Sequence, residues 1–237
     1  MYKCLILSVS NNTLARTLGA YRIAHVLREQ GWDAEVIDYV YYWSIEELKE
    51  LAKSRISSDT KFIGFSHLFS SWNDRLETFS LWLKEQYPDV VLISGCGVSP
   101  QFKSAAIDYH IQGFGENAVM VLIKWLFSNG DAPVFSIFDK KLIRANDQYP
   151  AFPLKSLMVR YEDRDYIRPD EWLTVEVSRG CKFKCDFCNF PVLGVKGDYS
   201  RDALDFYSQL KDTYDRFGVT NYLVADETFN DSTEKIS

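Results

Sequence analysis

The feature that most constrains the fold is the alternation of short apolar runs with amphipathic helical patterns over residues 1–130. Five runs predict strands, several of them apolar enough to be covered on both faces, at residues 3–9, 34–40, 61–67, 90–95 and 108–113. Apolar side chains between these runs recur at helical spacing, in the sets Ile23, Val26 and Leu27, then Leu76, Phe79 and Leu83, then Val119, Leu122, Ile123 and Leu126. This alternation predicts an α/β fold with a doubly wound, Rossmann-like parallel sheet, whose ligands bind at the carboxyl ends of its strands.

Two glycine-rich loops follow predicted strands. SGCGVSP, at residues 94–100, follows the fourth strand, and GFGENA, at residues 113–118, follows the fifth and opens a helix. The second loop matches the dinucleotide pattern Gly-x-Gly-x-x-Ala. However, it follows the last strand instead of the first, and no acidic residue stands at the expected distance. A tight turn from strand to helix explains its glycines without a nucleotide.

Composition excludes several classes of function. The net charge of -6 and the pI near 5.2 argue against a general nucleic-acid or membrane-surface binder, because both favour a basic face. The apolar run near the N-terminus is shorter than the roughly 7 to 15 residues of a signal sequence, and no segment reaches the roughly 18 needed to span a bilayer. We therefore expect a cytoplasmic protein. Because the cytoplasm is reducing, its five cysteines are better suited to metal binding or redox chemistry than to disulfides. Cys4 and Cys96, which lie in or beside predicted buried strands, are instead expected to be core residues.

Residues 131–170 differ from the preceding part of the chain because prolines, aromatics and charges mix without a clear period. We interpret this stretch as a connector, with a short hairpin at residues 135–143. The connector separates a first domain, residues 1–130, from a second that begins at residue 171.

The second domain opens with a predicted βαβ unit that carries a cluster of cysteines. A strand at residues 173–177 leads into a loop with Cys181, Cys185 and Cys188, and a second strand follows at residues 220–226. Between them, a helix is expected with Ser200 as N-cap, Gly218 as C-cap and an apolar face made of Leu204, Tyr207, Leu210, Tyr214 and Phe217. The three cysteines therefore lie at the carboxyl end of a parallel strand, which is the functional edge of such folds.

Three kinds of site compete for these thiols. Structural zinc needs four ligands, but the loop supplies three, and every histidine belongs to the first domain. A dithiol redox site uses only Cys185 and Cys188 and leaves Cys181 unexplained. An iron–sulfur cubane uses all three thiolates and leaves its fourth iron open to a substrate or cofactor.

The spacing Cys-x3-Cys-x2-Cys, with Phe187 before the third cysteine and Arg179-Gly180 before the first, resembles the signature of the radical S-adenosylmethionine superfamily. The resemblance implies a 4Fe-4S cluster held by Cys181, Cys185 and Cys188 in a partial TIM-type barrel, whose open iron chelates S-adenosylmethionine. It also implies an electron donor such as flavodoxin or ferredoxin. One electron cleaves the cofactor to methionine and a 5′-deoxyadenosyl radical, which abstracts hydrogen from a small-molecule substrate that the sequence does not identify.

The resemblance extends to a few further residues. Phe187 is expected either to pack near the adenine or to be a plain core aromatic. LVADETFN, at residues 223–230, resembles the end of the second barrel strand in members that carry a cobalamin-binding domain. Asp226 or Glu227 is expected to contact the methionine ammonium, in place of the Gly-Gly-Glu motif that the chain lacks, or to be a solvated or capping carboxylate. Four basic residues form a local basic group: Arg179, Lys182, Lys184 and Lys196. They are expected either to offset the negative charge of a cluster or to be solvated residues of a surface loop.

By the same resemblance, the first domain is similar to the cobalamin-binding fold that precedes this radical domain. The Asp-x-His-x-x-Gly signature, which supplies an axial histidine, is absent, because the loop after the first strand contains no histidine. Two alternatives stay open: cobalamin bound without a protein ligand, giving radical methylation, or a fold that has lost its cofactor. The methylthiotransferase subgroup fits poorly, since its first domain needs three more cysteines than Cys4 and Cys96 provide.

The length after the cluster limits what the second domain contains. A six-unit partial barrel needs on the order of 180 residues, whereas about 65 follow Trp172. NDSTEKIS, at residues 230–237, resembles a helix start with Ser232 or Thr233 as its cap. We therefore expect an incomplete barrel with an open parallel edge, and little radical activity from the chain alone. A second hypothesis is a non-catalytic accessory chain, either a split half that a partner completes or a binding module.

Overall fold

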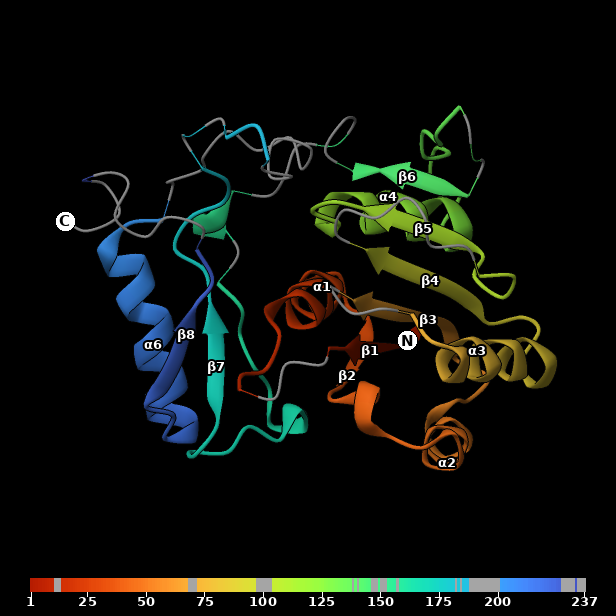
Figure 1. Ribbon diagram of the computed structural model, residues 1–237, viewed down its shortest axis with the longest axis horizontal. Coiled ribbons are helices and arrows are strands. Elements are labelled where there is room, and N and C mark those ends of the chain that lie inside the picture. The colour runs from red at the N-terminus through yellow and green to blue at the C-terminus, as the bar shows by residue number, and fades with distance from the viewer. Residues whose placement is uncertain are drawn as a thin grey trace.

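The first domain is built on a six-stranded parallel sheet. The computed structural model describes residues 1–10, 14–67, 72–96, 104–137, 139, 141–145, 149, 153–156, 158–181, 183, 185–187, 201–226 and 233. The strands are β1 Lys3–Val9, β2 Asp33–Ile37, β3 Thr60–His67, β4 Val91–Cys96, β5 Tyr109–Gln112 and β6 Leu142–Arg144. They pair in the order β2-β1-β3-β4-β5-β6, and every pair is parallel (Figure 1). The five predicted strands and the α/β class are thereby confirmed.

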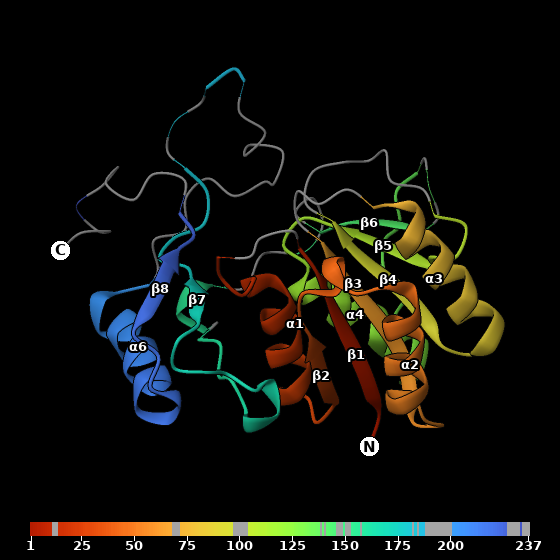
Figure 2. The same cartoon turned by 60° about the horizontal axis from the view of Figure 1, so that its bottom comes forward.

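Helices cover both faces of this sheet (Figures 1 and 2), as expected for a doubly wound fold. They are α1 Leu18–Glu29, α2 Ile45–Arg55, α3 Asp74–Gln86 and α4 Glu116–Phe127, with short 3-10 turns at Val40–Tyr42, Leu154–Ser156 and Asp163–Asp165. One core cluster joins α1 and α4 to the sheet through residues such as Leu27 and Leu122, and a second joins α2 and α3 through Leu48 and Phe79. None of the helices among the described ranges is both long and apolar enough to cross a membrane.

Two elements of the first domain were not predicted. Helix α2 begins with a capping box, in which Ser44 accepts from the Glu47 N–H while the Glu47 side chain accepts from the Ser44 N–H. The pattern Ser-x-x-Glu could have revealed this start. Strand β6 lies in the stretch interpreted as a connector, and it pairs with β5 in parallel. The expected hairpin at residues 135–143 is thus only a local reversal, with an isolated antiparallel bridge between Ser136 and Asp139.

The second domain contributes one βαβ unit: β7 Trp172–Val175, α6 Ala203–Phe217 and β8 Asn221–Val224. Strands β7 and β8 pair in parallel, as predicted, and α6 covers their side away from the first domain (Figures 1 and 2). Leu173 and Val219 belong to the same core cluster as α1, so the two parts share one core. On the other edge of β7, Arg16 forms an isolated parallel bridge with Leu173. The unit is therefore continuous with the first domain in packing and in hydrogen bonding.

Helix α6 differs from its prediction at two points. Its N-cap is Asp202, whose side chain accepts from the Asp205 N–H at 2.7 Å, whereas the predicted cap Ser200 lies outside the described residues. Gly218 ends the helix with φ of 72°, as predicted. The expected apolar face is only partly buried, because Leu204, Tyr207 and Tyr214 are exposed. A two-stranded sheet offers too little surface to cover a full helical face, and α6 instead buries Gln209 and Thr213.

Candidate functional site

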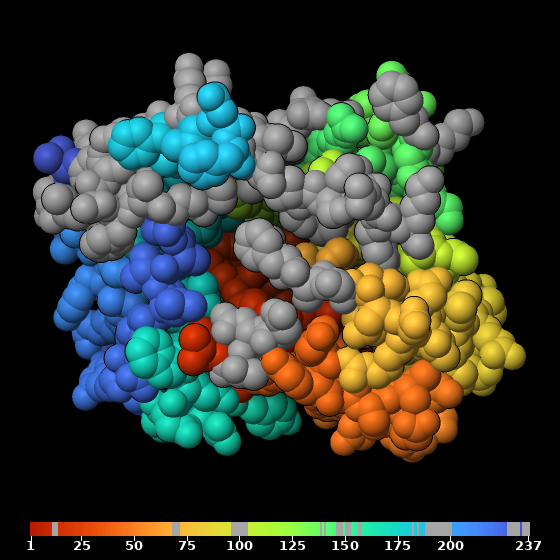
Figure 3. Space-filling model, in the orientation of Figure 1, coloured from red at the N-terminus to blue at the C-terminus, as the bar shows by residue number. Residues whose placement is uncertain are grey.

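The segment that contains Cys181, Cys185 and Cys188, called the cysteine segment below, follows the carboxyl end of β7. Cys181 is half-buried and Cys185 is exposed, and Figure 3 shows this part of the chain, in cyan, at the molecular surface. The main-chain N–H of Phe183 donates to Cys181 Sγ at 3.4 Å. Cys188 lies outside the described residues. Two of the three predicted ligands are thus near the surface, on the loop where the sequence predicted them.

The chemistry of these donors fits an iron–sulfur cluster. Thiolates are the usual ligands of such clusters, and hydrogen bonds to their sulfurs, like the one to Cys181, tune the reduction potential. Within the ranges that the structure describes, no group of three or more His, Cys, Asp or Glu residues is placed to hold a metal. Cys188 is outside those ranges, so this statement covers only two of the three thiols.

The predicted cofactor residues have different surroundings. Asp226 follows β8, and its Oδ2 accepts from the Ser178 hydroxyl, which follows β7, at 2.7 Å. The ends of the two parallel strands thus bring a carboxylate close to the start of the cysteine segment. Glu227 lies outside the described residues. Phe187 is 89% exposed, so its interpretation as a core aromatic is wrong, while its contact with adenine stays a prediction.

Arg179 departs most from its sequence-based interpretation. Its side chain is fully buried and therefore does not belong to a solvated charge run. It pairs with Glu116 at 2.5 Å and with Glu176 at 3.0 Å, and its guanidinium lies 4.2 Å from the centre of the Phe114 ring. Sequence reasoning missed this role because both Glu116 and Phe114 lie in the other domain. Lys182, Lys184 and Lys196 lie outside the described residues.

The GFGENA loop therefore has a structural partner. Gly115 is the N-cap of α4, and Glu116, in the first turn, is buried against Arg179. A carboxylate in the first turn of a helix is attracted by the helix dipole, and here it also neutralises the buried charge of Arg179. The turn interpretation of the loop is thus supported by the contacts of Glu116 and Phe114 with Arg179.

A second polar group lies in the first domain, towards the carboxyl ends of the central strands. His67, Ser94 and His110 come from β3, β4 and β5, and His67 Nε2 lies 2.9 Å from Ser94 Oγ. Burial, and after it the proximity of His110, lowers the pKa of His67 to about 4. The imidazole is therefore neutral at pH 7 and suited to hydrogen bonding. Sequence reasoning missed this group because the three residues are brought together only by strand pairing.

The pKa of His67 predicts a loss of stability in acid. The unfolded chain, with a histidine pKa near 6.5, takes up the proton before the folded chain, whose His67 pKa is about 4. The contribution of His67 is present above about pH 6.5 and is lost as the pH falls towards 4. Urea unfolding should therefore show roughly 2 kcal/mol lost between about pH 7.5 and pH 5 through this group. The variant H67Q, which keeps a side chain able to hydrogen-bond Ser94, should show a shallower pH dependence; an identical dependence would contradict the assignment.

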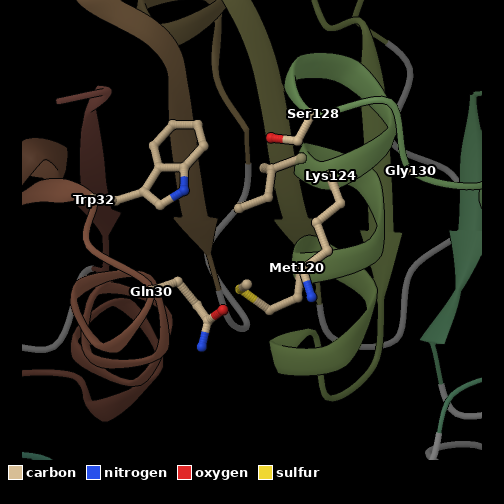
Figure 4. A pocket seen from close by; sticks show the side chains of 7 residues that line it. Gln30, Trp32, Met120, Lys124, Ser128 and Gly130 are labelled. Atoms are coloured by element: carbon tan, nitrogen blue, oxygen red, sulfur yellow. The ribbon is translucent and has the colours of Figure 1, made fainter.

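A pocket of about 350 Å³ lies between the ends of α1 and α4 (Figure 4). Gln30, Trp32 and Met120 line it together with Lys124 and Ser128. Because these helices run antiparallel to the strands, their C-terminal ends lie at the amino edge of the sheet, away from the cysteine segment. None of the described residues that line the pocket is a thiol, a carboxylate or a histidine.

The chain matches no protein-family model and no curated protein sequence.

Cys4 is fully buried in β1, and burial, followed by the charge of Asp33, raises the pKa of its thiol. Its predicted role as a core residue is thereby confirmed, whereas the side chain of Cys96 lies outside the description. Cys4 is therefore not part of the candidate site, which is made up of the cysteine segment together with Ser178, Arg179 and Asp226.

Proposed function

We propose that this chain carries the cluster-binding part of a radical S-adenosylmethionine enzyme. The observation that carries the proposal is the position of Cys181 and Cys185 on the loop at the carboxyl end of β7, in a parallel βαβ unit. With Cys188 they would supply the three thiolates of a 4Fe-4S cluster. The hydrogen bond from the Phe183 N–H to Cys181 supports the same choice of ligand.

In this proposal, the residues around the cysteines bind and orient the cofactor. When bound, the cluster supplies the electron that cleaves S-adenosylmethionine to methionine and a 5′-deoxyadenosyl radical. Ser178 orients the carboxylate of Asp226 through its 2.7 Å hydrogen bond, and Asp226 or Glu227 attracts the methionine ammonium. The exposed ring of Phe187 is available to cover the adenine. An external donor such as flavodoxin or ferredoxin delivers the electron.

The first domain enters the same proposal as a candidate cobalamin-binding unit. Its strand order reverses between β1 and β3, and ligands of open α/β sheets bind at such a switch point, outside the carboxyl ends of the strands. With cobalamin the reaction would be radical methylation, and without it hydrogen abstraction. The β7-α6-β8 unit would be the start of the partial TIM-type barrel.

An uncovered apolar surface favours a second candidate, an accessory chain that a partner completes. Large apolar side chains on α6 and β8 are exposed, namely Leu204, Tyr207, Tyr214, Leu223 and Val224. Among the described residues, β8 pairs only with β7, and no described strand occupies its other edge, where a further strand could pair. The two candidates differ in whether the cluster, once assembled, cleaves S-adenosylmethionine.

The proposal is tested by anaerobic reconstitution of the chain with iron and sulfide, followed by EPR of the reduced protein. A cluster signal that shifts when S-adenosylmethionine is added is the expected result, because the cofactor would bind the open iron. 5′-Deoxyadenosine formation by the chain alone would then exclude the accessory candidate. A cluster indifferent to S-adenosylmethionine, or no cluster at all, would contradict the proposal. Cobalamin binding is followed separately by its visible absorption spectrum.

A further inference from the structure

Both sides of the cysteine segment are attached to one residue, Glu176, at the end of β7. On the upstream side, Arg179 Nε donates to Glu176 Oε1 at 3.0 Å. On the downstream side, Arg201 Nη1 donates to the main-chain carbonyl of Glu176 at 2.9 Å. Arg201 also pairs with Asp205 of α6 at 2.9 Å, and its side chain is fully buried. Arg179 and Arg201, which flank the cysteines in the sequence, are therefore both held at Glu176.

The same anchor is connected to the first domain by two buried contacts. Glu176 forms a close ion pair with Arg22 of α1, and Arg179 pairs with Glu116 at the start of α4. The four side chains, two positive and two negative, are between 0 and 12% exposed. We call Arg22, Glu116, Glu176 and Arg179 the anchor network. Because its charges balance and are shielded from water, each member depends on its partners.

We propose that the anchor network positions the cysteine thiols for metal binding, with Glu116 and Arg179 as positioning residues supplied by different domains. Arg179 stands two residues before Cys181, so movement of its side chain shifts the start of the ligand loop. Holding both ends of the loop reduces the conformational freedom that the thiols lose when they converge on one cluster. The first domain thereby contributes to assembly of the site. The part of this inference that concerns the cluster rests on the proposed function.

Stability alone does not account for this arrangement. A buried ion pair often contributes little net stability compared with an apolar packing of the same volume. Residues that orient metal ligands, in contrast, typically change metal affinity by about 10- to 100-fold when they are replaced. Replacing a member of the anchor network should therefore change the position of the cysteine thiols more than it changes the stability of the fold. A matched control variant can separate these two effects.

The test compares E116Q with D165N in the full chain. Asp165 has a fully buried side chain and pairs with Arg28 of α1 at 2.7 Å, so D165N breaks an equally buried pair away from the cysteines. In the metal-free chain, we expect Cys181 to react with a thiol reagent several-fold faster in E116Q than in D165N. The reason is that Arg179 loses its charged partner, so that Cys181 is exposed to the reagent more often. Fully buried Cys4 reports global unfolding and should stay unreactive in both variants.

A second readout uses iron and sulfide in place of the thiol reagent. E116Q should lower iron affinity about tenfold in competition with a chelator and alter the EPR signature of the loaded cluster, whereas D165N should do neither. Equal reactivity of Cys181 and equal iron affinity in the two variants would overturn the inference. If E116Q fails to fold, E116D provides the same comparison, since it keeps the charge but withdraws it from Arg179. If the unmodified chain takes up no iron, the proposed function fails and the labelling comparison alone decides the inference.

Discussion

Replacing Cys181 by alanine is expected to abolish the cluster signal of the reconstituted protein and reduce bound iron to background. The proposed site offers three thiolates, and the loss of one leaves two ligands for a cubane that needs three protein contacts. C185A and C188A should have the same effect, because the three positions are equivalent as donors. Iron and sulfide analysis, together with EPR of the reduced protein, measures the result.

Cys4 provides the matched control for this experiment. Its thiol is fully buried in β1, and desolvation, followed by the charge of Asp33, raises its pKa, so it remains protonated and is not a ligand. C4A should therefore retain the full cluster signal. An equal loss of signal in C4A would show that the alanine variants act through misfolding. Retention of the signal in C181A would exclude the proposed ligand set.

Replacing Arg16 by alanine is expected to cost about 3–5 kcal/mol of unfolding free energy, because it leaves buried carboxylates without their counter-ion. Arg16 is 8% exposed, and it pairs with Asp38 at 3.0 Å and with Glu171 at 2.5 and 2.9 Å. It also donates to the carbonyls of Asp165 and Tyr166, at 2.8 and 3.0 Å. One side chain thus connects the end of β2 to the segment that leads into β7. Urea denaturation of the full chain measures the loss.

Arg168 is the control for Arg16, because it pairs with the same Glu171 carboxylate from the surface. Its side chain is 68% exposed, with Glu171 at 3.3 Å. Exposed ion pairs contribute at most about 1 kcal/mol, so R168A should change stability little. A small effect of R16A, comparable with that of R168A, would show that the buried carboxylates gain water or another partner when Arg16 is removed.

The strands of the first domain could be predicted because burial on two faces requires continuous apolar runs, as in residues 3–9, which form β1. Strand β6 could not be found this way. It has only three residues, and it is a strand because β5 offers it an edge. The solvent-facing apolar stripe of α6 was also beyond prediction, since helical periodicity shows which residues share a face and leaves open what covers that face.

The sequence by itself determined the α/β class, the parallel strands and the position of the cysteine segment at the carboxyl end of β7. These properties depend on local patterns of apolar residues, turn residues and cysteine spacing, and such patterns are formed by residues that are close together in the sequence. Only the tertiary structure decided that Arg179 is buried against Glu116, and that Glu176 holds both sides of the cysteine segment. Glu116 and Arg179 are 63 positions apart in the chain. An ion pair across such a separation depends on how α4 packs against the end of β7, which no local pattern encodes.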